Sequence, residues 1–427
     1  MSIKKRLAET NIYTFAIYSA LVTFLLYTCC YAFRKPFTVG LYEDEFLWGI
    51  DVKLLYVMSE ILGYACSKIV GTYLLPSVQK HQRIYYIAGL LIFSELAWLG
   101  FGFMPPSMKL VCTFLSGLPL GMIWGLVFSF IEGRRISEVL NVGLSVAVIV
   151  ASGMVKTLGQ SLMNTFGITE YWMPFATGAV ALPFVMLCCY LLNQIPEPND
   201  RDKIQRSERL PMTNSEKKNF IKQFSLGIVL LFLLFGSLTV FREVRDSFAA
   251  DVWAEYNITD SLIFTKSEFP IAVVVLVLMT SIVFVYNNRK ALRIMYVIAV
   301  LGAIITISST LAFMNNMLDP VWWMILMGLG MYMSYTIFTY FIDRLIGALR
   351  LTSTAVFMIY LIDSFGYMGT ASVFAIKNFS SVAISWTTIL IYLSLVSSII
   401  CIVTIVSLYF YFNKKIKAVE SGNPIIL

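Results

Sequence analysis

The sequence predicts an all-α membrane protein with twelve transmembrane helices, and three observations support this fold class. Of its 427 residues, 58% are hydrophobic and only 13% are charged, whereas soluble domains have about a quarter of their residues charged. Apolar runs of about 20 residues, the length that crosses about 30 Å of hydrocarbon as a helix, follow one another along the chain. Cations also gather in every second loop between these runs.

Each predicted helix is an apolar run bounded by polar or turn-forming residues. The first run is long and is followed by no small-residue cleavage site, so we expect it to stay in the mature protein rather than to be removed as a signal peptide. The twelve predicted spans are Asn11–Phe33, Lys53–Leu75, Ile84–Met104, Lys109–Ile131, Leu140–Met163, Tyr171–Leu192, Phe224–Asp246, Ser267–Tyr286, Arg293–Met314, Val321–Phe341, Ser353–Ile376 and Ile384–Phe412.

The loop charges predict the orientation. If every run crosses the membrane, the basic clusters all lie on one side, from Lys4, Lys5 and Arg6 at the start to Lys414 and Lys415 near the end. That side is expected to be the cytoplasm. The alternate loops are neutral or acidic, as in LYEDEFLWGID. This pattern favours a plasma (inner) membrane location with both termini on the cytoplasmic side. The net charge of +7 is therefore mostly a topology signal and does not indicate nucleic-acid binding.

The longest polar connection divides the runs six and six. We expect an N-terminal half over residues 1–196, a basic cytoplasmic linker over 197–222, and a C-terminal half over 223–427. This layout resembles the major facilitator superfamily, in which two six-helix halves hold the substrate near the bilayer midplane.

Ionisable residues inside the runs are the main functional candidates. Each costs some 2.5 to 3.5 kcal/mol in hydrocarbon even on the lenient insertion scale, so it is expected to face the bundle interior or a wet cavity. The candidates are Arg34, Lys35, Glu60, Lys68, Glu95, Lys156, the cluster Arg242, Glu243, Arg245 and Asp246, Glu268 and Asp363.

Helical spacing groups several of these residues into polar stripes. Tyr27, Tyr31 and Arg34 are spaced as i, i+4 and i+7, and Glu60, Tyr64 and Lys68 as i, i+4 and i+8. In the C-terminal half, Arg242 precedes Asp246 by four residues, and Tyr360, Asp363 and Tyr367 are spaced as i, i+3 and i+7. Guanidinium groups, a lysine and tyrosine hydroxyls are the donors that a desolvated phosphate dianion needs.

Simpler interpretations of the same residues remain open. Arg34 and Lys156 are each near enough to a helix end to extend to the membrane surface. Arg242 and Asp246 are spaced as an internal ion pair with no ligand, and Tyr332 and Tyr335 fit packing roles.

Short motifs in both halves resemble the organophosphate:phosphate antiporters, which include glycerol-3-phosphate, hexose-phosphate and sugar-phosphate exchangers. The first helix has YxxxYxxRKPF, the second has GYACSKIVG, the seventh has TVFREVRD, the eighth has TKSEFP, and the eleventh has FGYMGT. The bacterial members carry a histidine in the fifth helix, whereas SVAVIVASGMVK here ends in Lys156.

The resemblance implies exchange of a small organic phosphate or other organic anion, with inorganic phosphate as the counter-substrate, by alternating access. The expected partners are this anionic substrate and the lipid bilayer, and a monomer is expected. No cofactor or metal is expected, since the chain has a single histidine, His81, in a polar loop, and its seven cysteines form no CxxC pair. The implied substrate-binding residues are Arg34, Lys68, Arg242, Tyr27, Tyr31, Tyr64, Tyr367, Lys35, Arg245, Glu268, Asp363 and Tyr332.

Three other classes of protein stay open. A proton-coupled symporter or exporter of the same fold would use a carboxyl group of Glu60, Glu95, Glu268 or Asp363 to carry protons. A transporter-like sensor of sugar phosphate would report to a partner protein. An intramembrane enzyme is the least favoured class, because the sequence has neither an HExxH motif nor a nucleophile elbow, and no GxxxxGK[ST] loop for ATP.

The predicted orientation can be tested by cysteine labelling of intact cells. Single cysteines placed in the loop from Glu43 to Asp51 should react with an impermeant reagent from outside, whereas cysteines near Arg134 or Arg206 should react only after the membrane is opened. Labelling of the 197–222 linker from outside would show that the topology is inverted.

Overall fold

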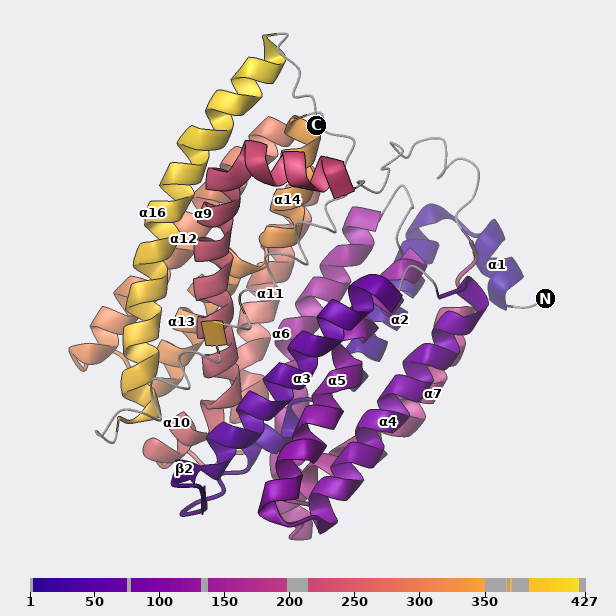
Figure 1. The fold of residues 1–427 in the computed structure, drawn as a ribbon, viewed down its shortest axis with the longest axis vertical. Coiled ribbons are helices and arrows are strands. Elements are labelled where there is room, and N and C mark those ends of the chain that lie inside the picture. The colour runs from indigo at the N-terminus through magenta and orange to yellow at the C-terminus, as the bar shows by residue number, and fades with distance from the viewer. Residues whose placement is uncertain are drawn as a thin grey trace. The chain divides into compact units, whose positions relative to one another are not determined.

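The computed structural model describes residues 3–74, 78–131, 137–197, 214–349, 366, 369–370 and 384–421, which are mostly helical (Figure 1). Within these ranges, eleven helices are long and apolar enough to cross a membrane. They coincide with eleven of the twelve predicted spans, with ends shifted by up to eight residues, and one of them, Pro320–Ala348, is interrupted by a short turn. The other predicted span, Ser353–Ile376, lies outside the described residues except for Gly366, Gly369 and Thr370.

The chain forms two compact units. Unit 1 comprises Met1–Arg206, Asp246–Ala272 and Phe374–Trp386, and unit 2 comprises Ser207–Arg245, Val273–Val373 and Thr387–Leu427. The six helices before the predicted linker belong to unit 1, together with the last residues of the seventh span and the first turns of the eighth. The division into halves at residues 197–222 remains a prediction.

Unit 1 is built on six packed helices. Helix α3 packs on α5, α4 packs on α5 and α7, and α2 packs on α6 and α7. A small antiparallel hairpin precedes α3, with Phe46 opposite Asp51 and Leu47 opposite Ile50. The elements are α1 (Ile3–Glu9), α2 (Ile12–Tyr31), η1 (Pro36–Val39), β1 (Phe46–Leu47), β2 (Ile50–Asp51), α3 (Val52–Leu74), η3 (Lys80–Gln82), α4 (Arg83–Phe103), α5 (Pro106–Ile131), α6 (Ser137–Phe166), α7 (Met173–Asn193), α10 (Ala249–Glu255) and the start of α11 (Ile263–Val283).

Unit 2 is organised around α12, which packs on α13 and α14. The predicted span Val321–Phe341 is divided, because α13 ends at Tyr335 and α14 begins at Phe338. The Thr336 hydroxyl donates to the carbonyl of Tyr332 at 2.7 Å, a side-chain bond that often accompanies a bend. The helices of unit 2 are α9 (Asn214–Ser247) up to Arg245, the rest of α11, α12 (Asn288–Met314), α13 (Pro320–Tyr335), α14 (Phe338–Ala348) and α16 (Trp386–Glu420).

Side chains of asparagine and aspartate fix several helix starts. Asn11 accepts the Thr14 amide at 2.8 Å before α2, and Asn287 accepts the Lys290 amide at 3.0 Å before α12. Asp319 accepts the amides of Val321 and Trp322 at 2.9 and 3.2 Å, just before a proline at the first position of α13. These bonds satisfy amides that have no partner within the helix, so local sequence determines where these spans begin.

Glycines allow two helix pairs to approach closely. A Cβ atom added to Gly63 of α3 would lie 3.0 Å from the carbonyl carbon of Phe114, and one on Gly117 of α5 would lie 3.2 Å from that of Glu60. In unit 2, Gly302 of α12 and Gly330 of α13 face each other's backbone in the same way. Small residues at such crossings permit backbone contact between membrane helices.

This packing predicts that Gly117→Ala destabilises the protein. The added methyl group would meet the backbone of Glu60, which cannot move without separating α3 from α5. Gly89→Ala in α4 is the matched control, since no described atom lies within 4 Å of its added Cβ and alanine favours the helix. Thermal unfolding in detergent should give a melting temperature several degrees lower for Gly117→Ala than for Gly89→Ala, and equal values would contradict the packing argument.

Candidate functional site

The first part of the candidate site is the point where α2 ends. Pro36 cannot donate the backbone hydrogen bond that would continue the helix to the carbonyl of Ala32, so the helix stops, and the carbonyl of Phe33 takes its partners from another helix. These partners are two side chains of α4: the Trp98 indole donates to Phe33 O at 2.7 Å and the Ser94 hydroxyl at 3.3 Å. The Thr38 hydroxyl then donates to the Lys35 carbonyl at 2.7 Å. The backbone carrying Arg34 and Lys35 is thereby fixed within unit 1.

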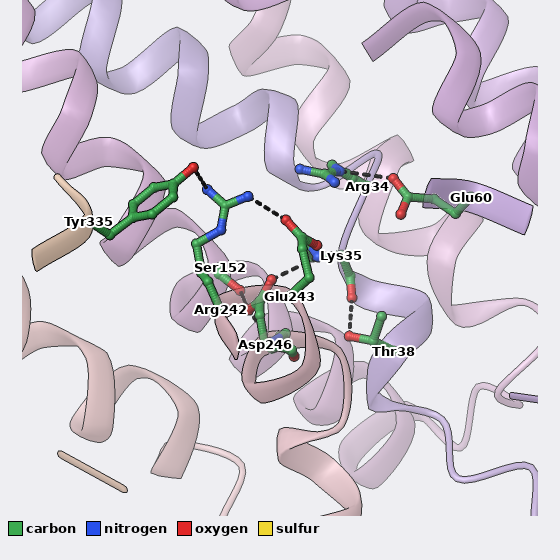
Figure 2. A network of polar contacts seen from close by, with 10 residues as sticks. Arg34, Lys35, Thr38, Glu60, Ser152, Arg242, Glu243, Asp246 and Tyr335 are labelled. Atoms are coloured by element: carbon green, nitrogen blue, oxygen red, sulfur yellow. Dashed lines mark hydrogen bonds and ion pairs between the residues drawn. The ribbon is translucent and has the colours of Figure 1, made fainter. Parts of the chain in front are cut away.

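Arg34 is buried, with 5% of its surface exposed. Its Nε donates to Glu60 Oε1 at 2.8 Å (Figure 2). Its guanidinium also lies over the Tyr64 ring, 3.8 Å from the centroid. Both partners come from α3, so the two predicted stripes meet. The guanidinium is held inside unit 1 by these contacts and is not an exposed group.

The other predicted residues of these stripes lie in the same unit and are buried. Tyr27 and Tyr31 pack edge to face with ring centroids 5.6 Å apart. The Lys68 ammonium lies 5.0 Å from the centroid of the Tyr64 ring. Tyr64 therefore contacts two cations, a stabilising arrangement where water is excluded.

The second part of the candidate site is the carboxylate of Asp246, which binds two lysines. Lys35 Nζ lies 2.8 Å from Asp246 Oδ2, and Lys156 Nζ lies 2.5 Å from Oδ1. The Ser152 hydroxyl also donates to Oδ1 (Figure 2). Lys156 donates to the Asp246 backbone carbonyl as well. Both lysines are at most 3% exposed, so Lys156 is not a lysine that extends to the surface.

This arrangement contradicts one sequence-based alternative. Four-residue spacing suggested that Asp246 pairs with Arg242, but among the described residues the partners of Asp246 are Lys35, Lys156 and Ser152. The pairing was wrong because helical spacing identifies only neighbours on the same helix. Lysines from two other elements reach the carboxylate instead.

Arg242 lies in unit 2 and has different partners. Its Nη2 donates to Glu243 Oε1 at 2.5 Å, and its Nη1 donates to the Tyr335 hydroxyl at 2.7 Å (Figure 2). The guanidinium carbon is 4.5 Å from the centroid of the Tyr335 ring. Arg245, 2% exposed, donates instead to the carbonyl of Met324 at 3.0 Å, which attaches α9 to α13.

Of the four remaining predicted site residues, two lie within the described structure and two do not. Glu268 is half-buried on α11, where a Cβ on Gly153 of α6 would lie 3.1 Å from its side chain. Tyr332 is buried in α13. Asp363 and Tyr367 lie outside the described residues.

Sequence reasoning missed Ser152, Glu243 and Tyr335 as partners of the charged groups. Ser152 lies four residues before Lys156, so a stripe on the fifth span could have identified it. No spacing rule could have paired Tyr335 with Arg242, because the two residues are 93 positions apart. Among the described residues, no group of three His, Cys, Asp or Glu side chains is arranged to hold a metal ion.

Two further ionisable groups of unit 1 lie outside this cluster. Glu95 of α4 is buried, and neither of its carboxyl oxygens has a hydrogen-bond partner among the described residues. Lys53 forms an ion pair with Asp251 of α10 at 2.6 Å. Burial raises the pKa of Asp251, and the Lys53 ammonium acts in the opposite direction.

The contrast between Glu60 and Glu95 predicts different effects of the same substitution. Glu60→Gln removes the charge that compensates the buried Arg34 guanidinium, and breaking such a pair typically costs about 3 to 5 kcal/mol. Glu95→Gln replaces a carboxyl group that binds no cation in the described structure. We expect a clearly lower melting temperature for Glu60→Gln and a nearly unchanged one for Glu95→Gln. Similar losses in both variants would mean that Glu95 also has an ionic partner.

Comparison with known proteins identifies the fold. A crystal structure of a D-xylose-proton symporter superposes with a TM-score of 0.63, covering 94% of this chain and 98% of that one at 14% identity. The partially occluded inward-open xylose transporter XylE from E. coli gives 0.62 at 12% identity, covering 94% and 99%. The nucleoside transporter NupG gives 0.58 at 13% identity, with the same coverage of 94% and 99%. No curated protein matches the sequence.

These similarities confirm the predicted fold class, an all-α membrane protein with the major facilitator superfamily fold. They do not extend to a specific substrate, since the identities are too low for that. The family of unknown function DUF5690 matches residues 36–415, from just after Arg34 and Lys35 to near the end of α16. The chain therefore belongs to this family.

Proposed function

We propose that the protein is a secondary active transporter that exchanges a small organic phosphate, or another organic anion, against inorganic phosphate. One observation supports this proposal most strongly: four buried cations are each held by an internal carboxylate. Arg34 is held by Glu60, Lys35 and Lys156 by Asp246, and Arg242 by Glu243. A protein that needed no anion could have avoided these costly buried charges.

The proposed binding residues have distinct roles. Arg34 and Arg242 offer planar forks that suit two oxygens of a phosphate group, whereas Lys35, Lys68 and Lys156 supply point charges. The hydroxyls of Tyr27, Tyr31 and Tyr64 would donate to the remaining oxygens. Arg245 is the weakest member of the proposed set, because its guanidinium bonds a backbone carbonyl.

The internal carboxylates also suggest why transport would be an exchange. An entering anion must displace a carboxylate that compensates buried cations, and its departure leaves those cations to be compensated again. If these ion pairs must open before the protein reorients, the empty protein reorients slowly, and a second anion accelerates reorientation by opening them. The proposed setting is a plasma membrane with both termini in the cytoplasm, as the loop charges predict.

A proton-coupled transporter of the same fold is the second candidate, and Glu95 favours it. A carboxyl group without a cation partner in an apolar interior is a candidate for carrying a proton during a transport cycle. One of the structurally similar proteins is a D-xylose-proton symporter. Uptake that collapses with a protonophore, without any requirement for a counter-anion, would favour this candidate.

The proposal predicts that Arg34→Lys is not a conservative change. Lysine offers one point charge in place of a planar fork, so counterflow of phosphate into phosphate-loaded vesicles should fall by about a hundredfold or more. The matched control is Arg289→Lys, where the arginine forms a partly exposed pair with Glu420 at 2.7 Å. This control should exchange normally. Near-normal exchange in Arg34→Lys, with protein that is folded and inserted, would exclude Arg34 from the binding site.

A further inference from the structure

Helix α9 has a sharp kink at its beginning. Phe224 leaves the helical conformation, with φ −113° and ψ 17°. The turns before Phe224 run across the direction of the turns after it (Figure 1). The part from Phe224 to Ser247 is about 36 Å long at 1.5 Å per residue, which is already enough to cross the hydrocarbon. The segment Asn214–Gln223 is therefore not needed for the crossing.

Contacts with α16 hold the kink in place. The Gln223 carbonyl accepts hydrogen bonds from Lys415 Nζ at 3.1 Å and from the Tyr411 hydroxyl at 3.4 Å. Phe224 is buried, with its ring centroid 6.4 Å from that of Phe412. All these residues belong to unit 2, so the orientation of Asn214–Gln223 is fixed by its own unit.

The surface around this kink is basic and borders an apolar band. The exposed lysines are Lys218 and Lys222 before the kink and Lys414 and Lys417 on α16, and Lys415 is partly exposed between them. We call these five residues the basic collar. The nearest described acidic residue of α16, Glu420, is bound by Arg289. Exposed Ile221, Leu226 and Phe410 lie next to the collar in sequence and suit contact with lipid chains.

We propose that the basic collar binds the headgroups of anionic phospholipids. Several lysines at the depth where a membrane helix leaves the hydrocarbon attract acidic lipids, and neighbouring apolar side chains enter the acyl region. The kink makes this possible, because it turns Asn214–Gln223 away from the direction of the crossing and brings its end, at Gln223, against Tyr411 and Lys415 of α16. A lipid bound there would fix the point where the 197–222 linker joins the second unit.

The test uses the full chain in a mild nonionic detergent and a fluorescent phosphatidylglycerol as the probe. We expect unlabelled phosphatidylglycerol to displace the probe, and phosphatidylcholine with the same acyl chains to displace it poorly. Lys222→Glu should weaken binding of the probe by about tenfold or more, and Lys222→Arg should bind it normally.

The matched control is Lys266→Glu, which reverses one charge at an exposed lysine of unit 1, remote in sequence from the collar. It should leave binding of the probe unchanged. Equal displacement by both lipids, or an equal loss in Lys222→Glu and Lys266→Glu, would overturn the proposal. Displacement of the probe by inorganic phosphate at millimolar concentration would also overturn it, since the site would then recognise a free anion rather than a lipid.

Discussion

The carboxylate of Asp246 is the interaction on which the candidate site depends most, because it compensates the charges of two buried lysines. Removing either lysine from water costs several kcal/mol unless a negative charge lies close by. Asp246 binds Lys35 from the turn after α2 and Lys156 from α6, and so joins three elements that are far apart in the sequence. Its loss would leave two like charges close together, and the turn after α2 would keep its Arg34–Glu60 ion pair but lose that of Lys35.

The backbone near Lys35 is prepared for this ion pair by uncharged groups. Pro36 ends α2, and the freed carbonyl of Phe33 is bound by Trp98 and Ser94 of α4. A broken helix is tolerated inside a membrane protein when neighbouring side chains satisfy its backbone, and such breaks often line a binding site. The positions of the Arg34 and Lys35 side chains therefore depend on hydrogen bonds between uncharged groups.

The sequence predicted the helices well and the ion pairs poorly. The physical reason is that a helix is specified by neighbouring residues, whereas an ion pair joins residues far apart in the chain. A transmembrane helix is specified locally by about 20 apolar residues, and a start such as that of α12 is specified by Asn287. An ion pair such as Arg34 with Glu60 depends on how two helices pack, which spacing along one helix does not specify. The same limit led to the wrong partner for Asp246, whereas Asp363 and Tyr367 lie outside the described residues.

In the proposed exchange, each carboxylate stands in for the anion while the site is empty. A monoanion that displaced Asp246 from its two lysines would only replace one negative charge with another. A phosphate dianion would neutralise both lysines and could leave Asp246 free to take up a proton or another cation. The Lys35, Lys156 and Asp246 cluster therefore favours doubly charged substrates over carboxylates in this proposal, and the organic part must be recognised by other residues. The neutral Tyr27 and Tyr31 pair is the nearest described candidate along the chain.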